Sequence, residues 1–134
     1  MLYRIIVAGG RDFNNKELLT LKLTDWIINL YLSRDWSDEA VSIEFISGNA
    51  SGADKLGEEF AKEYLYPLKL FPAEWNKYGK AAGPIRNKQM AEYASESDKG
   101  VLFAFWDGKS RGTKNMIDNA TQLGLEIYIV KYSN

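Results

Sequence analysis

Residues 47–54 read Ser-Gly-Asn-Ala-Ser-Gly-Ala-Asp and follow directly on a short apolar run at residues 41–46. Apolar residues then recur at helical spacing in residues 56–64. This pattern predicts a strand, a glycine loop and the start of a helix. Small residues let backbone N–H groups approach a bound group closely, and the first turn of a helix favours an anion. The loop therefore suits a phosphate, although a plain strand-to-helix turn capped by Ser51 or Asp54 explains the same residues equally well.

Strand and helix patterns alternate along the rest of the chain. Further strand-like runs lie at residues 3–8, 67–71, 99–105 and 126–131, and helical spacing recurs in residues 19–30, 90–94 and 116–123. Asn14 or Asn15 can cap the first helix, Gly124 is expected to end the last, and residues 73–83 read as an eleven-residue loop. Because every crossover is long enough to hold a helix, the sheet is expected to be mostly parallel. The prediction is a single α/β domain over residues 1–134, a three-layer sandwich with a Rossmann-like, doubly wound five-stranded sheet.

Composition excludes several classes of site. The chain has 134 residues, no cysteine, no histidine and a formal net charge of −1. Thiolate and histidine catalysis are therefore absent, and no metal site or cofactor is expected. The near-neutral charge gives no general attraction to nucleic acid, and no apolar run is long enough to cross a membrane. The lack of cysteine is compatible with a reducing cytoplasm, which is the expected location.

Polar and glycine residues follow the ends of four predicted strands. In parallel sheets, ligands bind beyond the carboxyl ends of the strands, so these loops are expected to form one site. Arg11, Arg86 and Arg111 each follow a strand end or open a helix, and arginine holds planar anions with two hydrogen bonds. Each arginine alone fits a solvated surface residue, but together with the glycines they indicate an anion site. The predicted ligand-binding residues are Gly9, Gly10, Arg11, Asp12, Gly48, Ser51, Gly52, Ala53, Asp54, Trp75, Arg86, Asn87, Asp107, Ser110, Arg111, Gly112 and Thr113.

Residues 110–113 form a second candidate anion cradle. The hydroxyls and amides of Ser110, Gly112 and Thr113 could share a phosphate with the first loop, although Ser110 or Thr113 could equally be a helix cap. Trp75 or Tyr78 at the same edge could stack on a base.

The other tryptophans are assigned to different roles. Trp106 fits packing slightly better than stacking on a ligand. Trp26 is assigned to packing and Trp36 to the surface.

Four carboxylates, Asp12, Asp54, Glu74 and Asp107, are expected within reach of this edge. Residues 9–14 (Gly-Gly-Arg-Asp-Phe-Asn) place their glycines side by side and lack the later glycines of the dinucleotide fingerprint. The glycine-lysine-serine/threonine ending of a P-loop is also absent. A nicotinamide enzyme and a nucleoside-triphosphate motor are therefore disfavoured.

These segments resemble the SLOG superfamily, the Rossmann-like group that includes the DNA-processing protein A and Lonely Guy families, and most closely its YspA-like or YAcAr branch. The matching segments are residues 8–13, residues 47–54, residues 71–75 with 83–87, and residues 106–113. The resemblance implies a pocket for a nucleotide, with Gly112-Thr113 in the place of the phosphate-binding glycine-threonine motif. Lonely Guy enzymes carry a glutamate three residues after that threonine, whereas this chain has Met116 there. In a hydrolase of this kind, Glu74 or Asp54 would have to replace the missing carboxylate.

Three functions are compatible with these observations. The first is a sensor-like domain that binds a nucleotide or a related phosphorylated molecule. The alternative is an N-glycoside hydrolase or transferase that acts on a nucleoside phosphate with a carboxylate catalyst. A protein-binding or DNA-associated module is the third, and the near-neutral charge argues against direct DNA binding. A homo-oligomer is compatible with the sequence.

Overall fold

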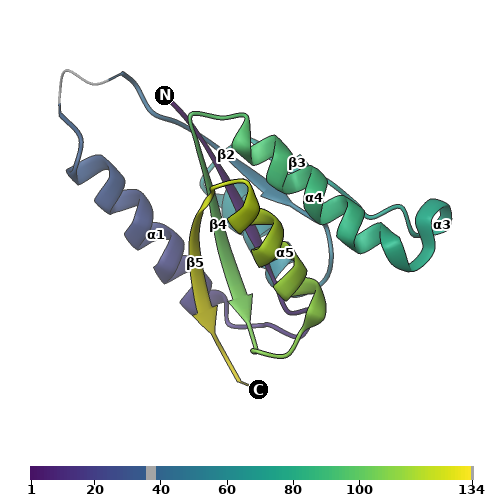
Figure 1. Cartoon of the computed structure of the whole chain (residues 1–134). Helices are drawn as coiled ribbons and strands as arrows, with labels where there is room; N and C mark the ends of the chain where they lie inside the picture. The colour runs from purple at the N-terminus through teal and green to yellow at the C-terminus, as the bar shows by residue number, and fades with distance from the viewer. Residues whose placement is uncertain (36–38, 134) are drawn as a thin grey trace.

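The computed structural model describes residues 1–35 and 39–133 and contains one five-stranded sheet (Figure 1). The strands are β1 (Leu2–Gly9), β2 (Ser42–Ser47), β3 (Leu68–Leu70), β4 (Lys99–Trp106) and β5 (Glu126–Lys131). Their order in the sheet is β3-β2-β1-β4-β5, and all four pairings are parallel. The chain first moves outward from β1 to β3 and then returns to the other side of β1. The predicted Rossmann-like, doubly wound α/β fold is therefore confirmed.

Helices cover both faces of the sheet. They are α1 (Lys16–Leu32), α2 (Ala53–Glu63), α3 (Trp75–Tyr78), the 3₁₀ turn η1 (Gly79–Ala81), α4 (Ala82–Ser95) and α5 (Arg111–Gln122). Figure 1 shows α1 on one side of the sheet and the neighbouring pair α4 and α5 on the other. The arrowheads of β4 and β5 point to the same end of the molecule, where the β4–α5 loop lies.

Strand β1 supplies core residues to both faces, as its continuous apolar sequence predicts. Ile5 and Val7 pack in the cluster beneath α1 and α2, whereas Ile6 and Ala8 pack in the cluster beneath α4 and α5. Ile5, Ile6 and Val7 are almost completely buried. The central strand is thus fixed from both sides, which gives the loop after it a rigid support.

Local signals in the sequence account for most helix ends. Asn15 caps α1 by accepting a hydrogen bond from Leu18 N at 3.0 Å, and Gly124 follows α5 with a φ of 74°. The alternative in which Ser51 or Asp54 caps α2 does not hold, because Gly52 occupies the cap position and no side chain caps the helix. The segment 73–83 is also not a plain loop, since α3, η1 and the first residues of α4 lie within it.

The two tryptophans assigned to packing and surface have different outcomes. Trp26 packs edge-on against Tyr3 with 5.8 Å between ring centroids, so its predicted packing role is confirmed. Trp36 lies outside the described residues. Among the described residues, every helix is too short or too polar to span a bilayer.

Candidate functional site

A cavity of about 450 Å³ lies at the carboxyl edge of the sheet, beside the point where the strand order changes direction. We refer to it as the main cavity. It is lined by Ala8, Gly9, Gly10, Arg11, Asp12, Ala50, Asp54, Trp75, Gly83, Pro84, Arg86, Asn87, Met90, Asp107, Ser110, Gly112, Thr113 and Met116. Segments that are far apart in the sequence therefore meet around one space, at the place where doubly wound folds bind their ligands.

A second cavity of about 260 Å³ adjoins the first, and we refer to it as the side cavity. It is lined by Arg11, Gly48, Asn49, Ala50, Ser51, Pro72, Ala73, Trp75 and Arg86. The two cavities share Arg11, Ala50, Trp75 and Arg86. These four residues form the boundary across which a single ligand could extend.

Most residues predicted to bind the ligand line one of the two cavities. Gly48 and Ser51 line the side cavity alone. Gly52 and Ala53 line neither cavity, and Arg111 lies in a separate groove with Trp106 and Lys114. Of the three arginines that were expected to converge, Arg11 and Arg86 line these cavities and Arg111 does not.

The two proposed catalytic carboxylates are also separated by the structure. Asp54 lines the main cavity, whereas Glu74 is exposed and lines a shallow depression formed by residues 73–77. Tyr78 lines neither cavity, so Trp75 is the aromatic side chain of this segment at the site.

The start of α2 differs from the predicted phosphate cradle. Ala53 N donates a hydrogen bond of 3.2 Å to Gly10 O, which also accepts one from Phe13 N. A Cβ at Gly52 would lie 2.2 Å from the same Gly10 oxygen. The backbone of the β1 loop thus occupies the space at this helix end and uses its first amide. Gly52 and Ala53 hold two loops together rather than facing the cavity.

The start of α5 is open instead. Ser110 caps the helix, since its Oγ accepts a hydrogen bond of 3.3 Å from Thr113 N. Within the described ranges, no group accepts a hydrogen bond from the backbone N–H of Arg111 or Gly112. A Cβ built on Gly112 would have no atom within 4 Å. Because the first amides of a helix attract anions, this end of the main cavity is the better place for a phosphate.

Asp107 stabilises the loop that leads into α5. Its Oδ1 accepts hydrogen bonds of 2.8 Å from both Lys109 N and Ser110 N. The Ser110 and Lys109 amides hold the pKa of this carboxyl below its usual range. Trp106 adds to the same turn, because its Nε1 donates to Ser110 O at 3.0 Å while the residue packs against the core beneath α5. Asp107 and Trp106 therefore shape the cradle.

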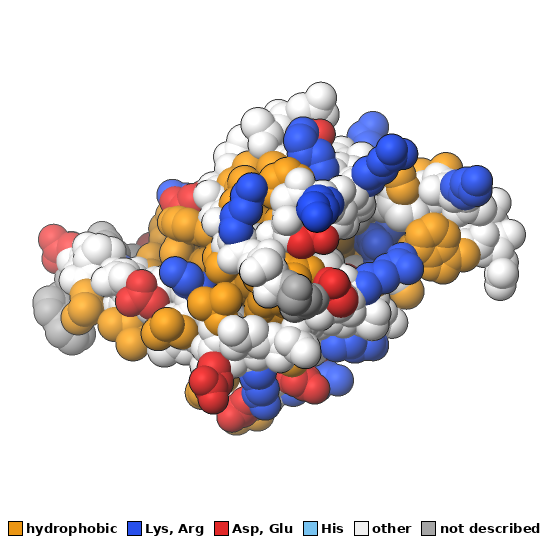
Figure 2. Space-filling model, turned by 90° about the horizontal axis from the view of Figure 1, so that it is seen from below, with side chains coloured by type: hydrophobic (Ala, Val, Ile, Leu, Met, Phe, Trp, Pro, Cys, Tyr) orange, Lys and Arg blue, Asp and Glu red, His pale blue; other side chains and the backbone are white. Residues whose placement is uncertain are grey.

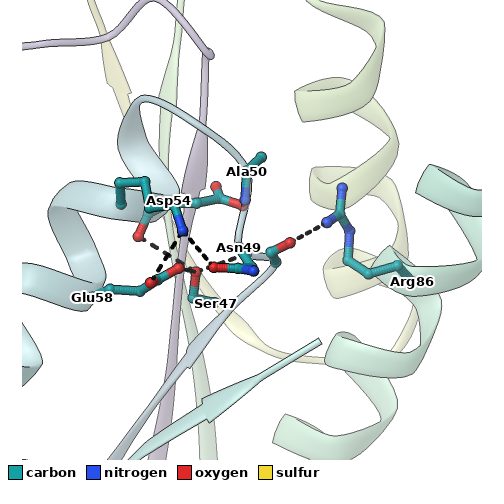
Figure 3. Close-up of polar contacts among 8 residues, drawn as sticks. Ser47, Asn49, Ala50, Asp54, Glu58 and Arg86 are labelled. Carbon is teal, nitrogen blue, oxygen red and sulfur yellow. Dashed lines mark hydrogen bonds and ion pairs between the residues drawn. The ribbon is translucent and has the colours of Figure 1, made fainter. Parts of the chain in front are cut away.

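Asp54 is the buried carboxylate of the main cavity, with 5% of its surface exposed. Its Oδ2 accepts a hydrogen bond of 3.2 Å from Ala50 N, which folds the loop back over the start of α2 (Figure 3). Burial raises the pKa of Asp54 to about 6, against the opposing effects of the Ala50 amide and the Arg86 charge. This carboxyl therefore changes its charge just below neutral pH.

A second buried carboxylate, Glu58, stands one helical turn after Asp54 and was not anticipated from the sequence. Ser47 Oγ donates to Glu58 Oε2 at 2.7 Å and accepts from Asn49 N at 3.0 Å. Figure 3 shows these groups side by side beneath the loop. The i, i+4 spacing of the two acids on α2 was the available signal. Glu58 supports the loop through Ser47 and is not among the residues that line the main cavity.

Arg86 links α4 to the loop after β2. Its Nη1 donates to Gly48 O at 2.5 Å (Figure 3). Its Nε donates to Asn87 Oδ1 at 3.0 Å. Burial lowers the pKa of Arg86, and the nearby positive charge of Arg11 acts in the same direction. Asn87 in turn donates to Gly112 O at 3.3 Å, so these contacts run from the β2 loop to the start of α5.

Arg11 and Asp12 follow β1 and take different directions. The Arg11 guanidinium lies 5.8 Å from the centre of the Trp75 ring, in a cation–π arrangement. Asp12 Oδ1 accepts a hydrogen bond of 2.6 Å from the hydroxyl of Tyr132, whose ring packs 4.9 Å from that of Phe13. Burial, together with this bond to Asp12, raises the pKa of Tyr132. Residues just after β5 thus fix the loop after β1.

The face that carries the site is basic in part. Figure 2 views the molecule from the end toward which the arrowheads of Figure 1 point. Blue lysine and arginine side chains gather over its upper and right-hand parts. The net charge of −1 therefore conceals positive charge around the site, while the lining of the main cavity itself has two arginines and three aspartates.

Comparison with known proteins gives the family. The model of the family described as "YspA, cpYpsA-related SLOG family" matches residues 3–78, which is more than half of the chain. This protein belongs to that SLOG family. The predicted resemblance is therefore confirmed. The matched segment of this SLOG protein contains every residue of the side cavity except Arg86, whereas the α5 end of the main cavity lies beyond it.

One relative of this SLOG protein covers nearly its full length. The Gene 61 protein of Mycobacterium phage D29 is 25% identical over 129 residues, which span 92% of this chain and 93% of that protein. No solved structure matches the chain significantly.

Proposed function

We propose that this SLOG protein binds a nucleotide or a nucleotide-derived ligand in the main cavity, with a phosphate at the start of α5. The observation that carries this proposal is the pair of amides at Arg111 and Gly112 that donate to no other group among the described residues. Gly112 lines a cavity of about 450 Å³, within the range of about 300–1,000 Å³ typical of small-molecule sites. Family membership supports a role in binding a nucleotide-related ligand.

The rest of the main cavity suits the nucleoside part of such a ligand. Trp75 is half exposed and its ring carries Arg11 on one side, so it provides a flat surface beside which a base can stack. Met90 and Met116 supply an apolar floor, and both are almost fully buried. Met116 stands where related hydrolases are expected to carry a glutamate. This apolar side chain favours a sensor or binding role over hydrolysis.

The first test is substitution of Gly112 by aspartate. The added carboxylate would stand beside the open amides, where its charge and volume should exclude a phosphate. We expect nucleoside monophosphates to bind at least about tenfold more weakly, which corresponds to about 1.4 kcal/mol, while the matching nucleosides bind as before. Calorimetric titration with a panel of nucleosides and their 5′-monophosphates measures this difference.

The matched control is Gly112→Ala. The space around this position is open in the protein, so alanine should leave stability nearly unchanged, and without a charge it should weaken phosphate binding much less than aspartate does. If wild-type protein bound nucleosides and nucleotides equally well, or if the aspartate variant bound both as tightly as wild type, the phosphate placement would be wrong.

A second candidate function is hydrolysis of the N-glycosidic bond of a nucleoside phosphate, and the buried carboxyl of Asp54 favours it. A carboxylate in a cavity wall can stabilise positive charge at the anomeric carbon, or accept a proton from the attacking water. Water would add its oxygen to that carbon, and the base would leave with a proton. The raised pKa of Asp54, about 6, would appear as an acidic limb in the rate profile.

Release of free base from a panel of nucleoside monophosphates distinguishes this activity from binding alone. Asp54→Asn should abolish the release and leave binding in place, while Glu74→Gln, which changes an exposed carboxylate outside both cavities, should not affect the rate. Ligand-dependent thermal stabilisation without any released base would leave the sensor role as the function of the site.

A further inference from the structure

We propose that the side cavity is a second anion subsite, so that the natural ligand carries two separated anionic groups. This inference rests on the proposed function, because it names the ligand class of the same site. The first anionic group lies at the start of α5, and the second lies between Arg11, Arg86 and Ser51. A nucleoside with one phosphate fills the main cavity alone, whereas a nucleotide with a second phosphate or other acidic group fills both.

The charges of the two cavities differ. The main cavity places Arg11 and Arg86 together with three aspartates, Asp12, Asp54 and Asp107. The side cavity contains the same two arginines, but none of its lining residues is acidic. An anion in the side cavity therefore meets the two guanidinium groups with no acidic residue in the lining, and the Asp54 carboxylate stands behind Gly48. The side cavity is the more favourable of the two for a fully charged group.

The arginines have capacity for such a group. Within the described residues, neither Arg11 nor Arg86 forms an ion pair with a carboxylate. Arg86 is held in place by Gly48 O and Asn87 Oδ1, and its Nη2 donates to no described group. Two like-charged guanidinium groups that border the same space gain from an anion placed between them.

Ser51 completes the subsite. Its side chain is exposed in the side cavity, and neither its hydroxyl nor its backbone N–H donates to a described residue. The hydroxyl and amide can therefore bind the same anion as the two guanidinium groups. Because Arg11, Ala50, Trp75 and Arg86 border both cavities, the two anion positions are parts of one continuous space. A single ligand can reach both positions.

Titration of ¹⁵N-labelled protein with inorganic phosphate tests the two positions separately. We expect the amide signals of Gly112 and Thr113 to shift with one saturation curve and those of Asn49 and Ser51 to shift with another. In the Ser51→Glu variant, the second set should stop responding while the first still saturates. Ser42→Glu, which adds the same charge at the opposite end of β2, is the matched control and should leave both responses intact.

A series of linear alkanediol bisphosphates then measures whether one molecule reaches both positions. Because the second group binds at a high effective concentration, one chain length should bind at least about tenfold tighter than the monophosphate of the same alcohol. The gain should disappear in Ser51→Glu and persist in Ser42→Glu.

Each result has one meaning. A response at Gly112 and Thr113 alone overturns the second subsite and leaves the proposed function standing. A response at Asn49 and Ser51 alone overturns the phosphate position at α5, and the two-group ligand with it. Two responses without any gain for a bisphosphate show two separate anion sites and also overturn the two-group ligand.

Discussion

Replacing Gly52 with alanine is expected to destabilise the protein by about 3–5 kcal/mol. Gly52 has a φ of 79° and a ψ of −127°, a backbone conformation that residues with a side chain rarely adopt. A Cβ would also lie 2.2 Å from Gly10 O and 2.6 Å from the backbone carbon of Arg11. Both neighbours are backbone atoms of a loop that Ala53 and Phe13 hold by hydrogen bonds, so neither can move freely.

Unfolding in urea, followed by tryptophan fluorescence, measures this loss directly. Gly112→Ala serves as the control, because it adds the same methyl group at the first turn of a helix where nothing lies within 4 Å. A loss below about 1 kcal/mol for Gly52→Ala would show that the β1 loop does not pack against α2 as described.

Replacing Asp54 with asparagine is expected to stabilise the protein at pH 7 by as much as about 3 kcal/mol. The pKa of this carboxyl rises from 3.8 to about 6 on folding, chiefly through burial, and each pKa unit corresponds to about 1.4 kcal/mol. Between these values the folded state binds more protons than the unfolded state. The contribution of Asp54 to the free energy of unfolding therefore falls as the pH rises from about 4 to about 6, and then stays constant.

Asparagine removes the charge but keeps an oxygen that can accept from Ala50 N, so the loop should hold its shape. Urea unfolding of both proteins between pH 4 and pH 8 gives two curves that should diverge as the pH rises through this window. Asp118→Asn is the control, because Asp118 is exposed and its one ion pair among the described residues is with Lys114 on the same helix. Loss of that pair should cost about 0.5 kcal/mol or less. Parallel curves for Asp54→Asn and wild type would mean that this carboxyl is well solvated.

The fold could be predicted from the sequence because its signals are local. The runs that became β1 and β4 are rich in β-branched and aromatic residues, and alternation with helical spacing requires parallel crossovers. Caps such as Asn15 and Ser110 are readable for the same reason, since each acts on amides within three residues. The short helix α3 was missed because a four-residue helix has no periodic pattern.

The site could be predicted only to the level of which loops meet. Arg11, Asp54 and Gly112 were placed at the correct edge because parallel strands end there together. Arg111 precedes Gly112 by one residue, and the helical phase of α5 places it in a separate groove rather than in the main cavity. No motif in the sequence indicates that direction. The burial of Glu58 depends on Ser47, a residue of the preceding strand, so its role required the tertiary structure. The cytoplasmic location, the absence of direct nucleic-acid binding and the oligomeric state stay predictions.

The hydrogen bond between Tyr132 and Asp12 joins residues 120 positions apart, and it has a consequence for biosynthesis. The ribosome makes the loop after β1 early, but β4, α5 and Tyr132, which complete its surroundings, emerge much later. Until β4 emerges, β1 lacks one of its two neighbours, and its apolar residues stay uncovered on that side. The cavity beside this loop therefore forms only once β4, α5 and Tyr132 have all left the ribosome.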